Sequence, residues 1–496
     1  MKRIRLRQHA RISILDAVAD PHLFAPWFND RDTWAAWSAF LAALFALPMT
    51  TDQLAIYRKC TGREEPPLSV ANEGWLVCGR RAGKSFVLAL VAVFLAAFHD
   101  YRQYLAPGER GTVLVIATDR KQARTILRYI RALLTRIRML SRIVEREAAE
   151  SFDLNNGVTI EVGTASFRSV RGYTIVAALL DELAFWPTDD SAEPDFEIIN
   201  AIRPGMATIP GAMLLCASSP YARRGALWDA HRRHYGKDGD PVLVWQADTR
   251  TMNPTVPQSV IDDAMERDPA SAAAEYGAQF RSDVESFVTR EAVEQCVDVG
   301  VFERAPMAGT KYVGFVDPSG GSSDSFTLAI AHKDGDAAIL DVVREHKPKF
   351  SPSEVVAEYA ALLKSYRIKK INGDRYAGEW AREPFRAHGV TYEANAKPKS
   401  DLYRDLLPSI NSGHVALLDL PRLSNQLIGL ERRTARGGKD SIDHAPGGHD
   451  DVANAVAGAV AMLGQASNYD TTMAWVGDPG SADEWRALRL RAHLFG

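Results

Sequence analysis

The sequence predicts two successive α/β domains, the first built on a parallel sheet and the second opened by an antiparallel hairpin. Short apolar runs alternate with helical stretches between residue 74 and about residue 280, which is typical of parallel strands covered by helices on both faces. A glycine-containing turn follows the first of these runs. A new pattern begins after residue 310, where two apolar runs flank the turn residues Lys333-Asp334-Gly335-Asp336.

The composition is that of a multidomain globular protein, with 496 residues, 46% of them hydrophobic and 24% charged. The net charge of -3 gives no global attraction to nucleic acid, so any DNA contact has to come from local basic patches. The four cysteines form no C-x-x-C pair, which indicates neither a zinc site nor a disulfide framework. The longest apolar run, residues 86–98, is too short to span a bilayer, and we expect a cytoplasmic protein without membrane contact.

The pattern predicts five segments along the chain. We expect a helical N-terminal arm at 1–70, a first domain at 71–285, a linker at 286–310, a second domain at 311–465 and a C-terminal tail at 466–496. Apolar runs predict strands at 75–78, 113–117, 175–180 and 213–217 in the first domain, and at 312–316, 326–332, 337–343 and 370–372 in the second. An alanine-rich helix is expected from residue 450 to about residue 464.

The first candidate site is a phosphate-binding loop between a strand and a helix, with the sequence Gly79-Arg80-Arg81-Ala82-Gly83-Lys84-Ser85. Backbone N–H groups of such a loop wrap phosphates, helped by the positive end of the following helix. Lys84 is expected to reach the β- and γ-phosphates of ATP, and Ser85 to bind Mg²⁺. The usual pattern has its first glycine at position 78, where this chain has Cys78, and the glycine is displaced to Gly79.

The partner of this loop is the buried run at 175–180, which ends in Asp181-Glu182. Ligands bind at the carboxyl edge of open α/β sheets, so both carboxylates are expected there. Asp181 would hold Mg²⁺, and Glu182 would orient and deprotonate an attacking water, which indicates ATP hydrolysis. Together the two motifs predict a P-loop ATPase domain of the ASCE/RecA-like class.

Other residues near this edge have two interpretations each. Ser218 and Ser219 follow the next strand, where small hydroxyls can sense the γ-phosphate or simply form a turn. Arg80 and Arg171 are candidates for stabilising the transition state, Arg171 from a neighbouring subunit. An isolated arginine is also often solvated surface, and this applies to a stripe at 124, 128 and 131.

The second candidate site is a set of aspartates in the second domain. Asp317 ends a strand, Asp374 follows another, and Asp450 and Asp451 open the last helix. Each alone is an ordinary turn or helix-cap residue. Together they match the clustered carboxylates with which a nuclease binds two Mg²⁺ or Mn²⁺ ions. A hairpin sheet that opens with an aspartate and closes with an acidic helix predicts an RNase H-like α/β nuclease domain.

Over roughly residues 70 to 465 the chain resembles the large subunit of tailed-bacteriophage terminases. The resemblance rests on the loop from Cys78 to Ser85, on Leu180-Asp181-Glu182, on Ser218-Ser219-Pro220, on Arg171-Gly172, and on Asp317, Asp374 and His449-Asp450-Asp451. Many relatives have a further aspartate where this chain has Asn454. Asp451 is the favoured metal ligand, with Asp450 in support, and the sequence leaves the choice between them open.

The resemblance implies a DNA-packaging motor. Such a subunit hydrolyses ATP to move double-stranded DNA into a procapsid, and cuts concatemeric DNA with its nuclease domain. The resemblance implies a pentamer docked on the portal protein and a small terminase subunit as partner. It also implies a location in the host cytoplasm and transiently at the procapsid portal, outside the mature virion.

Two other functions remain open at the level of the sequence. A repair-type helicase with a fused nuclease would separate strands, although such enzymes usually have two RecA-like lobes and this chain has one phosphate loop. An ATP-switched assembly factor would use the second domain only for docking, as an inactive nuclease-like module.

Overall fold

The chain forms two compact units in a computed structural model that describes residues 12–165, 172–186, 191, 193–321, 324–374, 378–434 and 440–466. One unit contains the residues up to 293 together with 420–450, and the other contains 294–419 together with the residues from 451 onward. The expectation of one continuous second domain at 311–465 is therefore wrong. Residues 420–450 group with the first unit because β17 (Leu430–Thr434) pairs with β9 (Val284–Ser286).

The segment expected to be a linker, 286–310, is also partly structured. It contains α12 (Arg290–Glu294) and β10 (Val297–Asp298), and β10 is an edge strand of the sheet in the second unit. Residues 281–310 show no apolar periodicity, so the sequence did not indicate β10. This strand is held in place by backbone pairing with β16 (Val415–Leu418).

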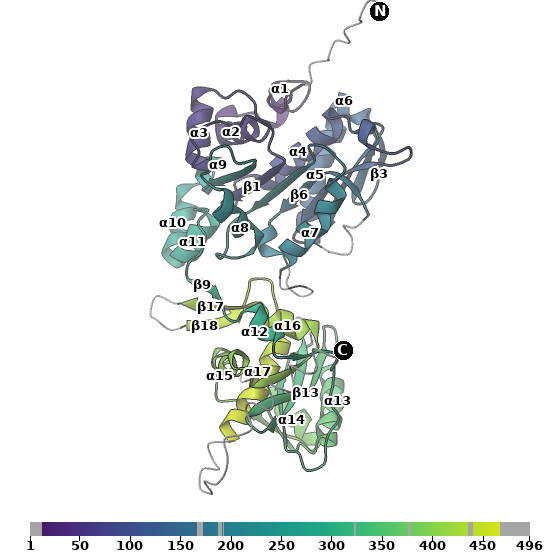
Figure 1. Ribbon diagram of the computed structural model, residues 1–496, viewed down its shortest axis with the longest axis vertical. Coiled ribbons are helices and arrows are strands. Elements are labelled where there is room, and N and C mark those ends of the chain that lie inside the picture. The colour runs from purple at the N-terminus through teal and green to yellow at the C-terminus, as the bar shows by residue number, and fades with distance from the viewer. Residues whose placement is uncertain are drawn as a thin grey trace, which may run out of the picture. The chain divides into compact units, whose positions relative to one another are not determined.

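A sheet forms the centre of the first unit (Figure 1). It has eight strands in the order β3-β4-β5-β2-β6-β7-β1-β8. In this order, every pair of adjacent strands between β5 and β8 is parallel. Strands β3 and β4 are antiparallel and lie at one edge of the sheet. The strands are β1 (Glu73–Cys78), β2 (Gly111–Ala117), β3 (Val144–Glu147), β4 (Ser151–Leu154), β5 (Val158–Thr164), β6 (Thr174–Asp181), β7 (Met213–Ser218) and β8 (Val242–Ala247). All four strands predicted for this domain are confirmed. Because β7 lies between β1 and β6, the strand order is that of the ASCE class.

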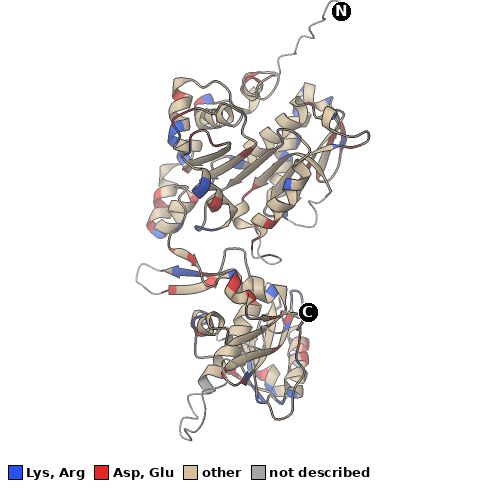
Figure 2. Cartoon of the chain, in the orientation of Figure 1, with Lys and Arg blue, Asp and Glu red and all other residues tan. Residues whose placement is uncertain are grey.

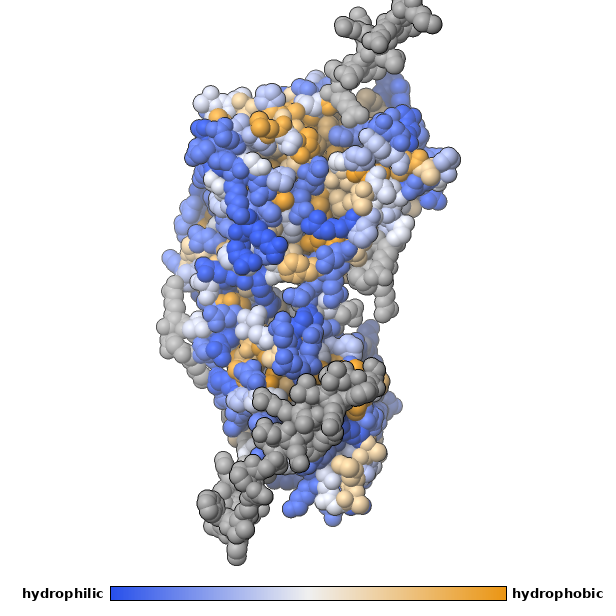
Figure 3. All heavy atoms as spheres, viewed as in Figure 1, coloured by the Kyte–Doolittle hydropathy of each residue, from blue (hydrophilic) through white to orange (hydrophobic). Residues whose placement is uncertain are grey.

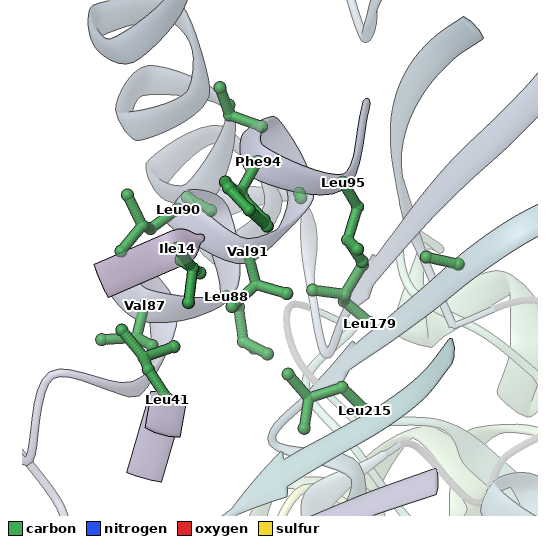
Figure 4. Packing of buried hydrophobic residues seen from close by; sticks show 14 of the residues in the cluster. Ile14, Leu41, Val87, Leu88, Leu90, Val91, Phe94, Leu95, Leu179 and Leu215 are labelled. Carbon is green, nitrogen blue, oxygen red and sulfur yellow. The ribbon is translucent and has the colours of Figure 1, made fainter. Parts of the chain in front are cut away.

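Both faces of this sheet are buried, which explains the continuous apolar runs in its strands. Successive side chains of a strand point to opposite faces, so Leu76 and Trp75 of β1 belong to different hydrophobic clusters. On one face, Ile14 and Leu41 of the N-terminal helices pack beside α4 (Lys84–Phe98), and Leu179 of β6 lies in the same cluster (Figure 4). The described part of the N-terminal arm is therefore part of this unit.

The remaining helices of the first unit surround the sheet and the loops at its edges. They are α1 (Ile14–Ala19), α2 (Ala35–Leu44), α3 (Thr51–Thr61), α5 (Arg120–Arg136), α6 (Arg138–Ser141), α7 (Pro194–Met206), α8 (Gly225–His234), α9 (Thr249–Met252), α10 (Gln258–Arg267), α11 (Pro269–Glu275) and α16 (Pro421–Ile428), with 3-10 turns η1 (Ala25–Trp27), η2 (Arg31–Trp34), η3 (Arg102–Tyr104) and η4 (Leu183–Phe185). A small antiparallel sheet, β18-β17-β9, completes the unit with β18 (Asp440–His444).

The second unit is built on a seven-stranded sheet in the order β10-β16-β13-β12-β11-β14-β15. Its strands are β11 (Tyr312–Asp317), β12 (Phe326–Asp334), β13 (Ala337–His346), β14 (Lys370–Gly373), β15 (Thr391–Ala394) and β16 (Val415–Leu418). The first three are antiparallel, and β14 and β15 continue parallel to β11, which is the RNase H-like arrangement. The predicted hairpin is confirmed, with Gly335 and Asp336 between the paired ends of its strands.

Helices α13 (Pro352–Ser365), α14 (Gly378–Ala387), α15 (Lys399–Asn411) and α17 (Asp451–Ala466) pack around this sheet. The helix expected from residue 450 is α17, which begins at Asp451. Basic and acidic residues are interspersed over both units (Figure 2), and the face shown in Figure 3 is mainly hydrophilic. Among the described residues, no helix combines the length and hydropathy that crossing a bilayer requires.

Candidate functional sites

The predicted phosphate loop connects the end of β1 at Cys78 to the start of α4 at Lys84. Gly83 has a left-handed φ of 101°, which a glycine adopts without strain. A Cβ atom at Gly79 would lie 2.3 Å from Thr249 Oγ1 and 2.6 Å from the carbonyl oxygen of Tyr276. The glycine displaced from position 78 to Gly79 is therefore required by the close approach of the segment after β8.

Side chains from distant segments hold this loop through its carbonyl groups. Trp37 Nε1 donates to the carbonyl oxygen of Ala82 at 2.9 Å. Thr249 Oγ1 donates to that of Arg80 at 2.8 Å, and Asn253 Nδ2 to that of Arg81 at 2.8 Å. With its carbonyl groups bonded outward, the loop keeps a fixed shape, which is what a phosphate-binding loop needs in order to present its N–H groups.

Lys84 lies at the centre of the polar groups around the loop. Its side chain is 4% exposed, and Nζ lies 3.1 Å from Glu182 Oε1 and 3.0 Å from Ser219 Oγ. Nζ also donates to the carbonyl oxygens of Cys78 and Gly79, both at 3.2 Å. A buried ammonium held by exchangeable partners at the mouth of a phosphate loop is suited to bind an anionic phosphate.

Asp181 and Ser85 lie together on the other side of the loop. Ser85 Oγ donates to Asp181 Oδ2 at 2.9 Å, and Gln122 Nε2 donates to both, at 2.9 Å to Ser85 Oγ and at 2.7 Å to Asp181 Oδ2. Burial, with the nearby charge of Glu182, raises the pKa of Asp181 to about 6. Asp181 Oδ1 is buried and has no hydrogen-bond partner among the described residues. A carboxylate oxygen left over beside a serine hydroxyl fits the oxygen-rich coordination of Mg²⁺.

Glu182 is placed to contact both the lysine and the serines after β7. It has a left-handed φ of 51°, the kind of strained conformation that clusters at functional sites. Its Oε2 accepts from Ser218 Oγ at 3.2 Å and from the backbone N–H of Ser219 at 3.1 Å. The predicted neighbourhood of Lys84, Asp181, Glu182 and Ser218 is therefore present.

The predicted arginines differ in their surroundings. Arg171 lies outside the described residues. Arg80 forms an exposed ion pair with Glu275, with 3.0 Å between Nη1 and Oε1. In the stripe on α5, Arg124 and Arg128 are exposed, and Arg131 bonds Glu147 at 2.6 Å.

The acidic residues of the second unit converge at the carboxyl ends of β11 and β14. These strands are parallel neighbours, so Asp317 and Asp374 emerge side by side. Asn454 Nδ2 donates to Asp317 Oδ2 at 2.8 Å and to Asp374 Oδ2 at 3.3 Å. Tyr392 Oη donates to the carbonyl oxygen of Asp374 at 2.9 Å, and a Cβ at Gly373 would lie 2.5 Å from that hydroxyl oxygen. The glycine before Asp374 thus makes room for this support.

Helix α17 is held against the sheet at short range. A Cβ at Gly458 would lie 2.3 Å from the ring of Phe315, so this glycine allows the helix to lie directly on β11. Thr327 Oγ1 donates to the carbonyl oxygen of Asp451 at 2.8 Å. Asp451 and Asn454 are three residues apart and therefore share one face of the helix. Asp317 and Asp374 share Asn454 as a hydrogen-bond partner, and such hard oxygen donors suit Mg²⁺ or Mn²⁺. The carboxylate of Asp451 is not within 4.8 Å of both of the other two, so the structure brings two of the three predicted aspartates close together.

Asp450 has different neighbours from Asp451. It is buried in the first unit, close to Asp443 and His444. One possible ligand atom from each of these three residues lies within 4.8 Å of the other two. The two adjacent aspartates thus belong to different groups of side chains.

Sequence reasoning did not identify Gln122, Trp37 or Thr249. Gln122 lies in the first turn of α5, the helix after β2, and its place shortly after a predicted strand was a signal that it lies at the same edge as Asp181. The contacts of Trp37 and Thr249 join segments tens to hundreds of residues apart, and no local pattern indicates them. Asn454 stood out in the sequence, although not for its contact with two carboxylates.

No family model and no curated protein matches the chain. Among solved structures, it is similar to the HK97 bacteriophage large terminase, with 17% identity, a TM-score of 0.36, and coverage of 79% of this chain and 91% of that one. It is similar to the large terminase of a thermophilic bacteriophage in complex with ATP-gamma-S, with 12% identity, a TM-score of 0.35, and coverage of 78% and 93%. It is also similar to the large terminase nuclease of thermophilic phage G20c with bound magnesium, with 17% identity, a TM-score of 0.30, and coverage of 34% and 95%. By their names, these three structures are two phage large terminases and the nuclease of a third.

Proposed function

We propose that the chain is the large subunit of a viral terminase, which hydrolyses ATP to move double-stranded DNA into a procapsid and cuts that DNA with a two-metal nuclease. One observation carries the proposal. A phosphate loop with Lys84 beside Glu182 and a pair of converging aspartates, Asp317 and Asp374, occur in separate units of one polypeptide. A motor that also ends its own reaction by cutting requires both centres.

The first centre is suited to hydrolysis of ATP rather than to transfer of phosphate to another substrate. Glu182 has a carboxylate oxygen 3.1 Å from Lys84 Nζ, so it lies next to where the γ-phosphate would bind. A carboxylate there can orient and deprotonate a water, for which a kinase has no use. Ser218 and Ser219, which bond the same carboxylate, are placed to respond when the γ-phosphate leaves.

The second centre is suited to cleavage of a phosphodiester. Two divalent ions clamp the attacking and leaving oxygens of such a bond, and they need carboxylates that converge on one point. Asp317 and Asp374 converge on the Nδ2 atom of Asn454, and Asp451 lies one turn earlier on the same helix. Mg²⁺ and Mn²⁺ are the ions that oxygen donors of this kind prefer.

The basic face of α5 supports DNA as the substrate. Between residues 120 and 143 there are eight arginines and lysines and no acidic residue, in a chain whose net charge is -3. Arg120, Lys121, Arg124 and Arg128 of this helix are exposed. Exposed cations along a helix bind the phosphate backbone without regard to sequence, as a motor that moves along DNA requires.

The assembly follows from the resemblance described above. We infer that the subunit works as a pentamer docked on the portal protein, receives DNA from a small terminase subunit, and acts in the host cytoplasm and transiently at the procapsid. Arg171 would then act on the ATP of a neighbouring subunit.

The experiment is a crossed comparison of two variants of the full chain. Glu182→Gln is expected to abolish ATP hydrolysis and to leave Mn²⁺-dependent cleavage of plasmid DNA intact. Asp317→Asn is expected to abolish cleavage and to leave DNA-stimulated ATP hydrolysis intact. Loss of both activities in one folded variant would overturn the division into two centres. ATP-dependent separation of strands by the wild-type protein would favour a helicase instead.

A further inference from the structure

The amide of Asn454 stands between two carboxylates of the acidic site. Its Nδ2 carries two hydrogens, and it donates one to Asp317 Oδ2 and the other to Asp374 Oδ2. Each bond offsets part of the repulsion between the carboxylates. A divalent cation would use the same oxygen lone pairs, so it competes with these N–H groups.

The other end of this amide is unsatisfied. Asn454 is 1% exposed, and its Oδ1 is buried with no hydrogen-bond partner among the described residues. Burying a carbonyl oxygen without a hydrogen-bond donor costs free energy, so the observed orientation of the amide leaves Oδ1 without a compensating hydrogen bond. A half-turn of the amide exchanges Oδ1 and Nδ2 with little change of shape, because the terminal torsion of asparagine is broad and the two atoms are nearly the same size.

We propose that Asn454 is a ligand of the cations through Oδ1, reached by this half-turn, and that its neutrality limits cation binding until DNA arrives. The proposal rests on the proposed nuclease function. Asparagine carbonyl oxygens bind hard divalent cations, and the number of charged ligands sets the affinity. Two divalent cations carry four positive charges, whereas Asp317, Asp374 and Asp451 supply three negative ones. The phosphodiester of the substrate adds the fourth.

Asn454→Asp tests the charge argument. It supplies the fourth carboxylate without DNA, so Mn²⁺ is expected to bind about tenfold more tightly than in the wild type. Mn²⁺ binding is measured by electron paramagnetic resonance of the free ion in the full chain without DNA. All proteins carry Asp181→Asn, which silences the nucleotide site, and Asp317→Asn in the same background gives the binding that belongs elsewhere.

Asn454→Ala tests whether Asn454 binds the cation or only hydrogen-bonds to the two carboxylates. If Oδ1 binds the cation, alanine weakens Mn²⁺ binding about fivefold, as expected when a ligand is lost. If the amide only competes for the carboxylates, alanine leaves Mn²⁺ binding unchanged or tightens it, and the proposal is overturned. It is also overturned if Asn454→Asp binds Mn²⁺ no more tightly than the wild type.

The control is Asn156→Ala, which removes an amide of the first unit whose Nδ2 donates to the carbonyl oxygen of Ala96 at 2.7 Å. It is expected to bind Mn²⁺ as the wild type does. The rise in melting temperature on adding Mn²⁺ is a second readout, and it should be larger for Asn454→Asp than for the wild type. Neither readout requires DNA cleavage. A protein that binds Mn²⁺ as expected but never cuts DNA would overturn the proposed function and leave this inference standing.

Discussion

Gln122 donates its side-chain N–H to Asp181 Oδ2 at 2.7 Å. The same nitrogen reaches Ser85 Oγ at 2.9 Å, so one amide at the start of α5 fixes both groups that we expect to bind Mg²⁺. Groups that orient metal ligands from behind change metal affinity when they are removed. Gln122 is therefore a positioning residue of the ATPase site.

Gln122→Ala is expected to raise the Mg²⁺ concentration for half-maximal ATP hydrolysis by about 10- to 100-fold, the usual effect of losing such a partner. The maximal rate at saturating Mg²⁺ should change much less. ATPase assays over a Mg²⁺ titration measure both quantities. Gln258→Ala, on exposed α10, is the control. An unchanged Mg²⁺ requirement would contradict the assignment.

Trp37→Phe tests the brace between the N-terminal helices and the phosphate loop. It removes the donor to the buried carbonyl oxygen of Ala82 and should lower the free energy of unfolding by about 1–3 kcal/mol. Because that carbonyl is in the loop, nucleotide affinity should fall as well. Urea unfolding and titration with a fluorescent ATP analogue measure the two effects. In Trp380→Phe, where the indole is 37% exposed, neither should change.

Glu431 of β17 is fully buried, and its removal should destabilise the first unit strongly. Tyr221 Oη donates to its Oε2 at 2.6 Å, and Arg433 Nη2 does so at 3.2 Å. Arg224 forms an ion pair with Oε1. Glu431→Ala leaves two arginines without their carboxylate, and we expect a loss of about 3–5 kcal/mol in urea unfolding. Tyr221→Phe removes one neutral donor and should cost about 1 kcal/mol. Equal losses for the two variants would show that the carboxylate is not the centre of the cluster.

The buried thiols should be unreactive near neutral pH. Burial raises the pKa of Cys60 and of Cys78 to about 12. Because only the thiolate reacts, the reactive fraction at pH 8 is on the order of 10⁻⁴ and grows tenfold with each pH unit below that pKa. Mass spectrometry after iodoacetamide treatment at pH 8 should find both cysteines unmodified in the native protein and alkylated in urea. Rapid labelling of native Cys78 would contradict its burial behind the phosphate loop.

The sequence was most informative where function and strand order coincide. Lys84 and Asp181 are almost a hundred residues apart, yet their proximity was predictable because parallel strands bring their carboxyl ends to one edge. Asp317 and Asp374 also follow neighbouring parallel strands, although only their positions at strand ends were predicted. These predictions depended on the ends of continuous apolar strands, which are the clearest pattern in a doubly covered sheet.

Features that arise from pairing between distant segments were not predictable. Strand β17 is only five residues long and has one apolar residue, Leu430, followed by three charged ones, and its partner β9 lies far earlier in the chain. The residues of such a strand do not indicate which unit it will pair with. Gly79 is a similar case, since its need for a missing Cβ comes from Thr249, which only the folded chain brings near.

The return of residues 420–450 to the first unit limits how the protein can be divided for study. The polypeptide passes from one unit to the other three times, after residues 293, 419 and 450. Any single cut between residues 293 and 420 leaves β9 on one fragment and its partner β17 on the other, each with an unpaired edge that invites aggregation. A soluble C-terminal fragment would therefore require excision of 420–450 and a short designed connection from residue 419 to α17, rather than simple truncation.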